Sequence, residues 1–449
     1  MSECRHTSVP ETLIFGGEVI DPVARRRYRA DLLLRDGLIA EIDPSGELDR
    51  AEVPGRVRID ATGRLVMPGF IDMHVHLREP GFEYKETIET GCRSAVVGGV
   101  TGVACMANTR PVNDSPAVTR FILERARVAG LARVFPVGAV SVGLAGEQLA
   151  EFAGMRAEGI VAVSDDGQPV RDSELMRRAL ECAALFGMPV LDHAEDPTLG
   201  AGGVMHEGPV SLRLGLQGIP AAAEDVMVAR DIALAELTGA HLHICHISSG
   251  RAVEMIRMAR AGGIRVTAEV SPHHLWLTDE AVMGYNTNAK MAPPLRSEAD
   301  RLKLLEGLAD GTISVIATDH APHHRDEKDV EFATAANGVV GLETLLPLTL
   351  RLVEMGVLEL PDAIAKITSE PAAILGLPYG RLECGVPADL TIVDPDEEWP
   401  VERATLRTRS YNTPFHGWTM KGRAQQTLVG GRLVFDRQAE ASTTAAAGK

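Results

Sequence analysis

LVMPGFIDMHVHLREP, residues 65–80, is the stretch of this chain that decides its fold. An apolar run with Val66 and Phe70 leads into His74 and His76. Residues two apart on a β-strand point to the same side, so the sequence predicts a buried strand whose two imidazoles project together. Such a pair is typical of a metal site. Two solvent-facing histidines on a strand edge are the alternative, unless other ligand-type residues meet them.

Composition limits the class of protein. The chain has 449 residues, 45% of them apolar, and a mean hydropathy of +0.02, which allows a large α/β barrel and a second module. No apolar run reaches the roughly 18 residues of a membrane span, and MSECRHTSVPE lacks the apolar core of a signal peptide. We therefore expect a cytoplasmic protein. Free, mostly buried thiols are expected of its six cysteines, which form no C-x-x-C pair: Cys4, Cys92, Cys105, Cys182, Cys245 and Cys384.

The formal net charge of −17 argues against nucleic acid or an anionic membrane as a partner, because long-range repulsion opposes the encounter. An anionic substrate would meet the same repulsion. Any such substrate must therefore be bound by a local excess of positive charge, from a metal ion and arginine.

The middle of the chain alternates between strand and helix patterns. Most of the apolar segments are separated by stretches with apolar residues at helical spacing, such as residues 172–187 and 249–263. The strand candidates are residues 66–76, 99–108, 132–140, 159–166, 188–195, 241–249, 264–274 and 312–323. Eight strands with intervening helices predict a (β/α)8 TIM barrel, and a doubly wound open sheet is the alternative.

Polar residues favour the barrel, because they fall at the carboxyl ends of the strands, where barrel enzymes carry their sites. Imidazoles and carboxylates on one rim suit zinc or a similar divalent ion. The candidates are His74, His76, Asp165, Asp166, His193, His246 and Asp319. Alternation along the strand favours His246 over His241 and His243. Structural hydrogen bonds are the preferred interpretation of His273, His274, His320 and His324.

Both ends of the chain read as short strands and turns. TLIFGGEVID near the start resembles TLVGGRLVFD near the end, and neither arm has enough strands to be stable alone. We therefore predict a small β-sandwich module built from residues 1–66 and 379–449, with the catalytic barrel over 67–378. Two unrelated hairpins are the alternative.

Longer motifs carry a family resemblance. They are GFIDMHVHLREPGFEYKETIETG, MANTRPVNDSP, VSDDG, GMPVLDHAED, AEVSPHHL, PPLRSEADR, IATDHAPHHRDEK, GLETLLPL and NTPFHGW. In these the chain resembles the bacterial class I dihydroorotases, within the cyclic amidohydrolases. The resemblance implies a barrel with a β module, one or two Zn²⁺ ions, and six metal ligands: His74, His76, Asp166, His193, His246 and Asp319.

One inference rests on this sequence itself. The hydantoinases, the allantoinases and the other class of dihydroorotase resemble one another in bridging two metals with a carboxylated lysine after strand 4. No lysine occurs between Lys85 and Lys290. Asp166 is therefore the natural bridging residue.

The expected chemistry is the reversible hydrolysis of the L-dihydroorotate ring amide to N-carbamoyl-L-aspartate, the third step of pyrimidine synthesis. Zinc lowers the pKa of a bound water from about 15.7 to about 7. Asp319 is the predicted general base and acid, and a purely ligating role is its alternative.

Substrate recognition is expected from a carboxylate-binding group. Arg78, one further step along the same strand alternation as the two histidines, offers a planar pair of donors, and its alternative role is an ion pair with Glu79 or Glu86. Asn108 is the second candidate. The remaining positions that the resemblance implies are His76, His323, Asn337 and Gly338.

Two positions depart from the family pattern. Ala292, in KMAPPLR, stands where members commonly have asparagine, and Asn337 stands where phenylalanine is expected. Losing one hydrogen-bond donor to a bound anion weakens binding by about 1–3 kcal/mol. These two positions therefore put the substrate preference in question.

Two other functions remain open: a hydantoinase-like or allantoinase-like enzyme, and a catalytically silent scaffold for aspartate transcarbamoylase. That transcarbamoylase is also a candidate partner of an active enzyme, and we expect a homo-oligomer. Residues 324–338, rich in charged and small side chains, suggest a mobile cover over the site.

Overall fold

An eight-stranded parallel sheet is the centre of the computed structural model, which describes residues 10–48 and 53–447. A parallel bridge between Val75, at the end of the first strand, and His320, after the last, closes this sheet into a barrel. The predicted (β/α)8 barrel is confirmed. Its strands in chain order are β8 (Phe70–Val75), β9 (Val100–Cys105), β10 (Arg133–Gly138), β11 (Ala162–Val163), β12 (Val190–Asp192), β15 (Leu242–Ile244), β16 (Val266–Val270) and β17 (Val315–Ile316).

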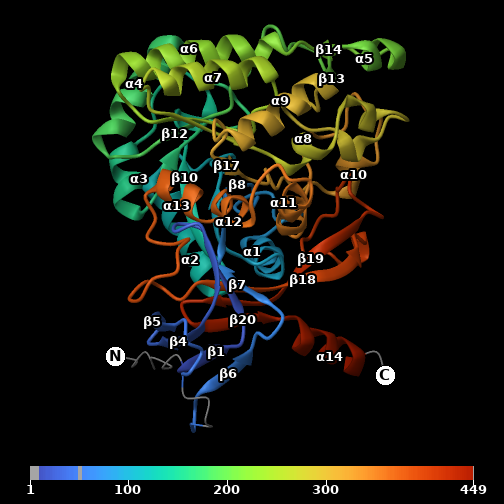
Figure 1. The fold of residues 1–449 in the computed structure, drawn as a ribbon. Helices are drawn as coiled ribbons and strands as arrows, with labels where there is room; N and C mark the ends of the chain where they lie inside the picture. The colour runs from blue at the N-terminus through green and yellow to red at the C-terminus, as the bar shows by residue number, and fades with distance from the viewer. Residues whose placement is uncertain (1–9, 49–52, 448–449) are drawn as a thin grey trace.

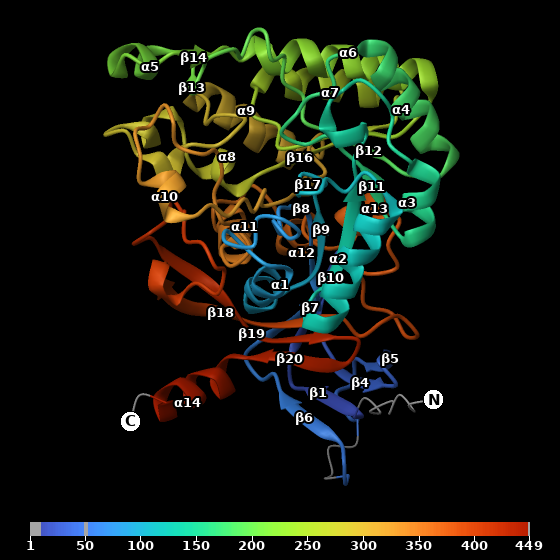
Figure 2. The same ribbon diagram turned by 180° about the vertical axis from the view of Figure 1, so that it is seen from behind.

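Helices surround this barrel (Figures 1 and 2). The strands are short and buried on both faces, as expected where helices cover a parallel sheet. The main surrounding helices are α1 (Ile88–Val97), α2 (Pro116–Ala129), α3 (Phe152–Glu158), α4 (Ser173–Leu185), α6 (Ala222–Thr238), α7 (Gly250–Ala261), α9 (Glu298–Ala309), α11 (Leu345–Glu354), α12 (Leu360–Ala365) and α13 (Ser369–Leu375). Shorter elements are β13 (Met205–His206), α5 (Pro209–Leu214), β14 (Gly218–Ile219), α8 (Pro272–Trp276) and α10 (Arg325–Lys328).

The first predicted strand, residues 66–76, is in fact two strands. β7 (Leu65–Pro68) belongs to a different sheet, and β8 starts after Gly69. A side chain at Gly69 would have its Cβ 2.2 Å from Thr101 Oγ1, so the chain can pass there only as glycine. The sequence did not reveal this division, because both halves are equally apolar.

The two ends of the chain form one module of two sheets, below the barrel in Figure 1. β7 pairs with β18 (Leu390–Pro400), with Leu390 opposite Pro68, which joins the N-terminal arm to the C-terminal arm. The predicted β-sandwich is confirmed. The six-stranded sheet also contains β2 (Glu18–Asp21), β3 (Arg26–Arg29), β19 (Thr419–Val429) and β20 (Arg432–Asp436), and the four-stranded sheet contains β1 (Thr12–Phe15), β4 (Asp31–Arg35), β5 (Leu38–Asp43) and β6 (Val57–Asp60).

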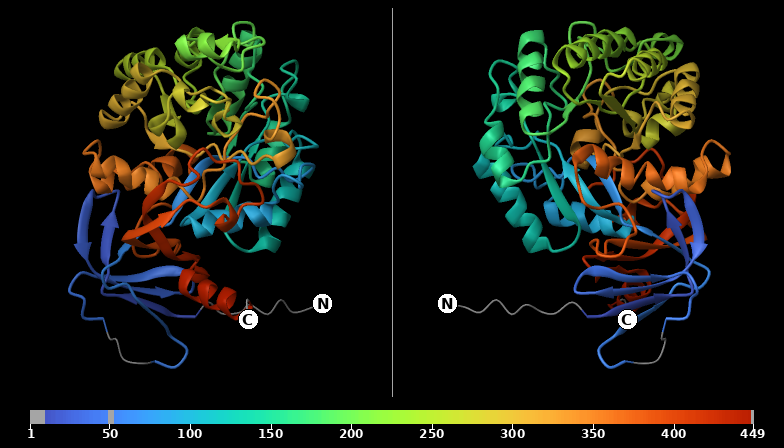
Figure 3. Two further views of the ribbon diagram at one scale, coloured as in Figure 1. Left: turned by 90° about the vertical axis from the view of Figure 1, so that its right-hand side faces the viewer. Right: turned by 60° about the vertical axis from the view of Figure 1, so that its left-hand side comes forward.

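The two similar stretches differ in structure. β19 and β20 form a hairpin, whereas β1 and β2 lie in different sheets. Apolar side chains from both arms share one core, which includes Ile14, Leu32, Leu34, Leu390, Ile392 and Leu428. Figure 3 shows the blue and red strands together beneath the barrel, with α14 (Arg437–Ala447) beside them. The domain boundaries at residues 66 and 379 stay a prediction.

The cysteines follow the expectation in part. Cys92, Cys105 and Cys245 are buried free thiols, Cys182 is half-buried and Cys384 is exposed, while Cys4 lies outside the described residues. Within the described part of the chain, no helix is long and apolar enough to cross a membrane.

Candidate metal centre and substrate pocket

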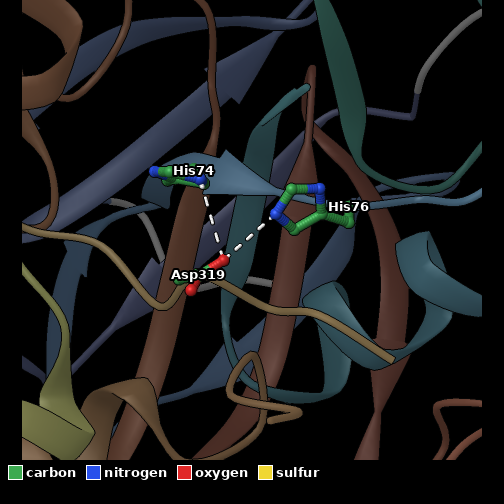
Figure 4. A group of neighbouring side chains, drawn as sticks. All are labelled: His74, His76 and Asp319. Carbon is green, nitrogen blue, oxygen red and sulfur yellow. Dashed lines mark hydrogen bonds and ion pairs between the residues drawn. The ribbon is translucent and has the colours of Figure 1, made fainter. Parts of the chain in front are cut away.

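The predicted ligands from five strand ends meet at the rim of the barrel. His76 Nε2 lies 3.1 Å and His74 Nε2 lies 3.7 Å from Asp319 Oδ1. Figure 4 shows both histidines facing this carboxylate. On the other side, His193 Nδ1 and His246 Nε2 are 3.0 Å apart. All five side chains are buried, so few water molecules compete with an ion for these donors.

Asp166 lies between the two groups of histidines. Its Oδ1 is 3.2 Å from His246 Nε2, 3.5 Å from His193 Nδ1 and 3.4 Å from His74 Nε2, whereas its Oδ2 is 3.4 Å from His76 Nε2. Asp166 therefore contacts all four histidines, with Oδ1 facing three of them and Oδ2 facing His76. This arrangement can bridge two cations.

The donor set fits a divalent metal ion. Four ligands at the Zn–N distance of about 2.0–2.1 Å are about 3.3 Å from one another, and the distances here cluster around that value. His74 Nε2 is buried and, among the described residues, has no hydrogen-bond partner, as expected of an atom kept for a metal. Two overlapping sets share His74: one with His76 and Asp319, the other with Asp166 and His246.

Three residues of the site adopt left-handed backbone conformations. The φ angles of Arg78, His246 and Asp319 are +63°, +32° and +47°. Such angles are unfavourable for residues with a side chain and are often found at functional sites. The ends of the strands also correct the reasoning from strand alternation. β8 ends at Val75 and β15 ends at Ile244, so Arg78 and His246 lie beyond the strands and reach the site through turns.

Glu269, on β16, supports the metal centre and is absent from the sequence-based prediction. Its carboxylate accepts a hydrogen bond from His74 Nδ1 (2.5 Å) and contacts His243 Nε2 (3.2 Å). This contact leaves His74 Nε2 free to face the metal position. Burial raises the pKa of Glu269, but His74 and His243 outweigh it and lower that pKa, so the carboxylate is charged. The sequence AEVSPHH shows a glutamate inside a predicted strand, but not that its side chain is buried.

We expect Glu269→Gln to weaken metal binding by about 10- to 100-fold, because the neutral amide no longer orients His74. Competition with a chromophoric chelator measures the affinity. Glu343→Gln, at a half-buried glutamate that accepts from Ser94 Oγ (3.0 Å), is the control. Equal affinity in Glu269→Gln and wild type would contradict the role.

Asp165 and the remaining histidines have other contacts. Asp165 accepts hydrogen bonds from Val140 N and Ser141 N, at 2.8 and 3.0 Å, and holds the preceding loop. His241 Nε2 contacts Thr267 Oγ1 (2.9 Å), His274 Nε2 contacts Pro293 O (3.1 Å), His320 Nδ1 accepts from Gly341 N (3.1 Å), and His324 caps α10. His273 differs: within the described chain, its buried Nε2 has no hydrogen-bond partner.

A pocket of about 420 Å³ opens beside the metal centre. Its lining contains all of the residues predicted to contact substrate: His76, Arg78, Asn108, His323, Asn337 and Gly338. Ala292 also lines it, where an asparagine was expected from the resemblance. Asn108 has a further role, since its Oδ1 accepts from His76 Nδ1 at 2.8 Å and orients that imidazole.

Arg78 faces the pocket without either of the two ion pairs considered above. Glu79 binds Arg125 (2.7 Å), and Glu86 accepts from Arg409 N (3.1 Å). The Arg78 guanidinium donates instead to Pro322 O (3.1 Å) and lies 3.1 Å from His323 Nε2. Burial, with Arg78, Lys85 and Lys328 nearby, lowers the pKa of His323, so this imidazole is neutral.

Comparison with known proteins identifies the family of this chain. Residues 63–252 match the family model described as "Dihydro-orotase-like". The chain is 56% identical over 423 residues to a dihydroorotase of Syntrophotalea carbinolica, covering 94% of this chain and 98% of that protein. The chain belongs to the dihydroorotase family. A second dihydroorotase, from Geobacter sp. strain M21, is 54% identical and is covered to 99% of its length.

Solved structures place the family fold among hydrolases of cyclic amides. The L-hydantoinase of Arthrobacter aurescens superposes with a TM-score of 0.84 at 26% identity, covering 95% of this chain and 96% of that chain. The D-hydantoinase of a Thermus species gives 0.77 at 26% identity, with 95% of each chain covered. The barrel and β module are thus shared, and sequence similarity is much greater to dihydroorotases.

Proposed function

We propose that this protein is a zinc-dependent dihydroorotase that interconverts L-dihydroorotate and N-carbamoyl-L-aspartate in pyrimidine synthesis. The observation that carries this proposal is the juxtaposition of Asp166, between two histidine pairs, with the guanidinium of Arg78 in one pocket. Asp166 and the histidines supply a metal site for amide hydrolysis. Arg78 supplies a cation for the substrate carboxylate.

One or two zinc ions would be held by His74, His76, Asp166, His193, His246 and Asp319. Bound zinc makes water a nucleophile at neutral pH and polarises a carbonyl group. A donor set of imidazoles and carboxylates favours zinc among common divalent ions. Asp166, whose carboxylate lies near four histidines, would serve both ions in a two-zinc site.

Asp319 is the residue we assign to proton transfer. In hydrolysis its carboxylate takes a proton from the attacking water, whose oxygen forms a bond to the ring carbonyl carbon. The bond from that carbon to the ring nitrogen breaks, and Asp319 returns the proton to the nitrogen. Asp319 Oδ1 lies 3.1 Å from His76 Nε2, and both residues line the pocket, which supports this assignment.

The substrate carboxylate would bind to Arg78 and Asn108, with His323, Asn337 and Gly338 completing this part of the pocket lining. A guanidinium can engage a carboxylate through two parallel hydrogen bonds. Since the whole chain carries a net charge of −17, this local positive charge must outweigh the overall field.

The two other functions are less well supported. A hydantoinase-like enzyme has fold similarity in its favour, but those structures are 26% identical, against 56% for a dihydroorotase. A silent scaffold would not require the buried ligand set to converge. We retain aspartate transcarbamoylase as a proposed partner, together with a homo-oligomeric state and a cytoplasmic location.

The test is dihydroorotate hydrolysis by purified protein with metal analysis of the same sample. We expect one or two zinc ions per chain, turnover that is lost with a chelator, and recovery of turnover when zinc is restored. Assays with and without aspartate transcarbamoylase determine whether a partner is needed. Turnover of hydantoin without turnover of dihydroorotate would refute the proposal.

A further inference from the structure

Two buried lysines lie behind the pocket wall that contains Asn337 and Gly338. Lys290 is 5% exposed and Lys328 is 3% exposed. Within the described residues, neither ammonium group lies within ion-pair distance of a carboxylate. Glu327, next in sequence to Lys328, is instead paired with Lys85 at 2.8 Å. A buried charge without a counter-charge is costly, so other contacts must offset this burial.

Those contacts are main-chain carbonyls of a single segment. Lys290 Nζ donates to Phe332 O (2.8 Å), Ala333 O (2.9 Å) and Ala335 O (2.7 Å). Three donors thus meet three acceptors. The ammonium group holds residues 332–335 in a tight arc immediately before the pocket residues.

Lys328 completes the arc from its other end. Its Nζ donates to Ala336 O (2.7 Å), Gly338 O (3.2 Å) and Lys290 O (3.3 Å). Lys290 O also accepts from Gly338 N at 2.9 Å. The two lysines are therefore joined through one carbonyl, and the pair determines where Gly338 lies.

The position of Gly338 matters because the wall is crowded. Its φ is +136°, and a Cβ there would lie 2.7 Å from Ala321 Cβ and 3.1 Å from His323 Cδ2. Asn412 also binds this wall, donating to Gly338 O (2.9 Å) and accepting from His323 N (3.0 Å). A small movement of the arc would therefore displace His323 as well.

We propose that Lys290 and Lys328 are positioning residues, which shape the 332–338 wall of the substrate pocket by binding its carbonyls. The inference deepens the proposed dihydroorotase function and rests on it for the identity of the anion. Burial, with Lys290 nearby, lowers the pKa of Lys328 to about 7, in keeping with an ammonium group that lacks a counter-charge. Five of these hydrogen bonds hold residues 332–338, the second half of the segment predicted as a mobile cover.

Steady-state kinetics of Lys290→Met and Lys328→Met test the proposal. We expect KM for dihydroorotate to rise by about tenfold to a hundredfold, with kcat changed far less, because the wall binds the anion in both ground and transition states. Zinc content should remain that of wild type, since neither lysine contacts the ligands.

Lys366→Met is the matched control. Lys366 is 8% exposed and donates to Ile313 O at 2.6 Å, and it does not line the substrate pocket. This variant loses a buried ammonium of the same kind, so KM should stay within about twofold of wild type. An equal rise in KM in all three variants would attribute the effect to general destabilisation and overturn the proposal.

Hydrogen exchange separates this inference from the proposed function. The main-chain amide of Gly338, which donates to Lys290 O, should exchange faster in Lys290→Met and in Lys328→Met, and should remain protected in Lys366→Met. Unchanged exchange at residues 332–338 would overturn the role of the lysines, whatever the substrate. If the proteins show the expected exchange pattern but the wild type does not turn over dihydroorotate, only the proposed function and the identity of the anion are refuted.

Discussion

Replacing Asp319 by asparagine is expected to lower kcat for dihydroorotate hydrolysis by a factor of about 10² to 10⁴. Asparagine keeps the shape of the side chain and an oxygen that can face a metal, but it cannot accept the proton of the attacking water. Asp319 Oδ1 lies 3.1 Å from His76 Nε2. Because the asparagine oxygen can take the same position, this substitution should leave the neighbouring ligands in place. Steady-state assays with zinc analysis of the same sample measure the effect.

The control for Asp319→Asn is Asp389→Asn. Asp389 is also a buried carboxylate, beside β18 of the β module and paired at 2.6 Å with Arg133 of the barrel strand β10, and its replacement should leave kcat within about twofold. If Asp319→Asn loses zinc and regains wild-type kcat at high zinc concentration, Asp319 acts only as a ligand, and the proton-transfer role is wrong.

Replacing Arg78 by methionine is expected to reduce kcat/KM for dihydroorotate by about 10²- to 10³-fold, because losing one partner of a buried charge pair costs about 2–5 kcal/mol. Most of the loss should lie in KM, since the carboxylate is bound in ground and transition states alike. Arg78→Lys should recover only part of it, because an ammonium keeps the charge and loses the two-pronged geometry. The measurement is a full set of kinetic constants for the three proteins.

Arg260→Met is the control for Arg78. Its guanidinium also donates to a main-chain carbonyl, that of Thr312 at 2.7 Å, and it does not line the pocket. We expect kcat/KM within about twofold of wild type. A loss of less than fivefold in Arg78→Met would show that another cation binds the substrate carboxylate.

Much of the architecture could be predicted from the chain itself. Alternating strand and helix patterns indicated the barrel, and the polar residues after each strand indicated its rim, because parallel strands place their carboxyl ends on one side. Strand alternation was a poor guide beyond the strand ends. Both His246 and Arg78 follow their strands by at least two residues and have positive φ angles.

The supporting residues were harder to predict than the ligands. Glu269 stands alone inside a strand, and its contact with His74 joins positions 195 residues apart. Nothing local distinguishes such a glutamate from one that faces solvent. The same holds for Lys290 and Lys328, since lysine is normally exposed and only the fold shows that carbonyl groups surround these two.

The sequence by itself determined the order of strands and helices and the residue types offered for metal and anion, because these depend on local periodicity and side-chain chemistry. Only the tertiary structure decided that Asp166 lies within 3.5 Å of four histidines, that β7 pairs with β18, and that two lysines lie behind Gly338. Those contacts join residues distant along the chain. They exist only after barrel closure and side-chain packing have brought such residues together.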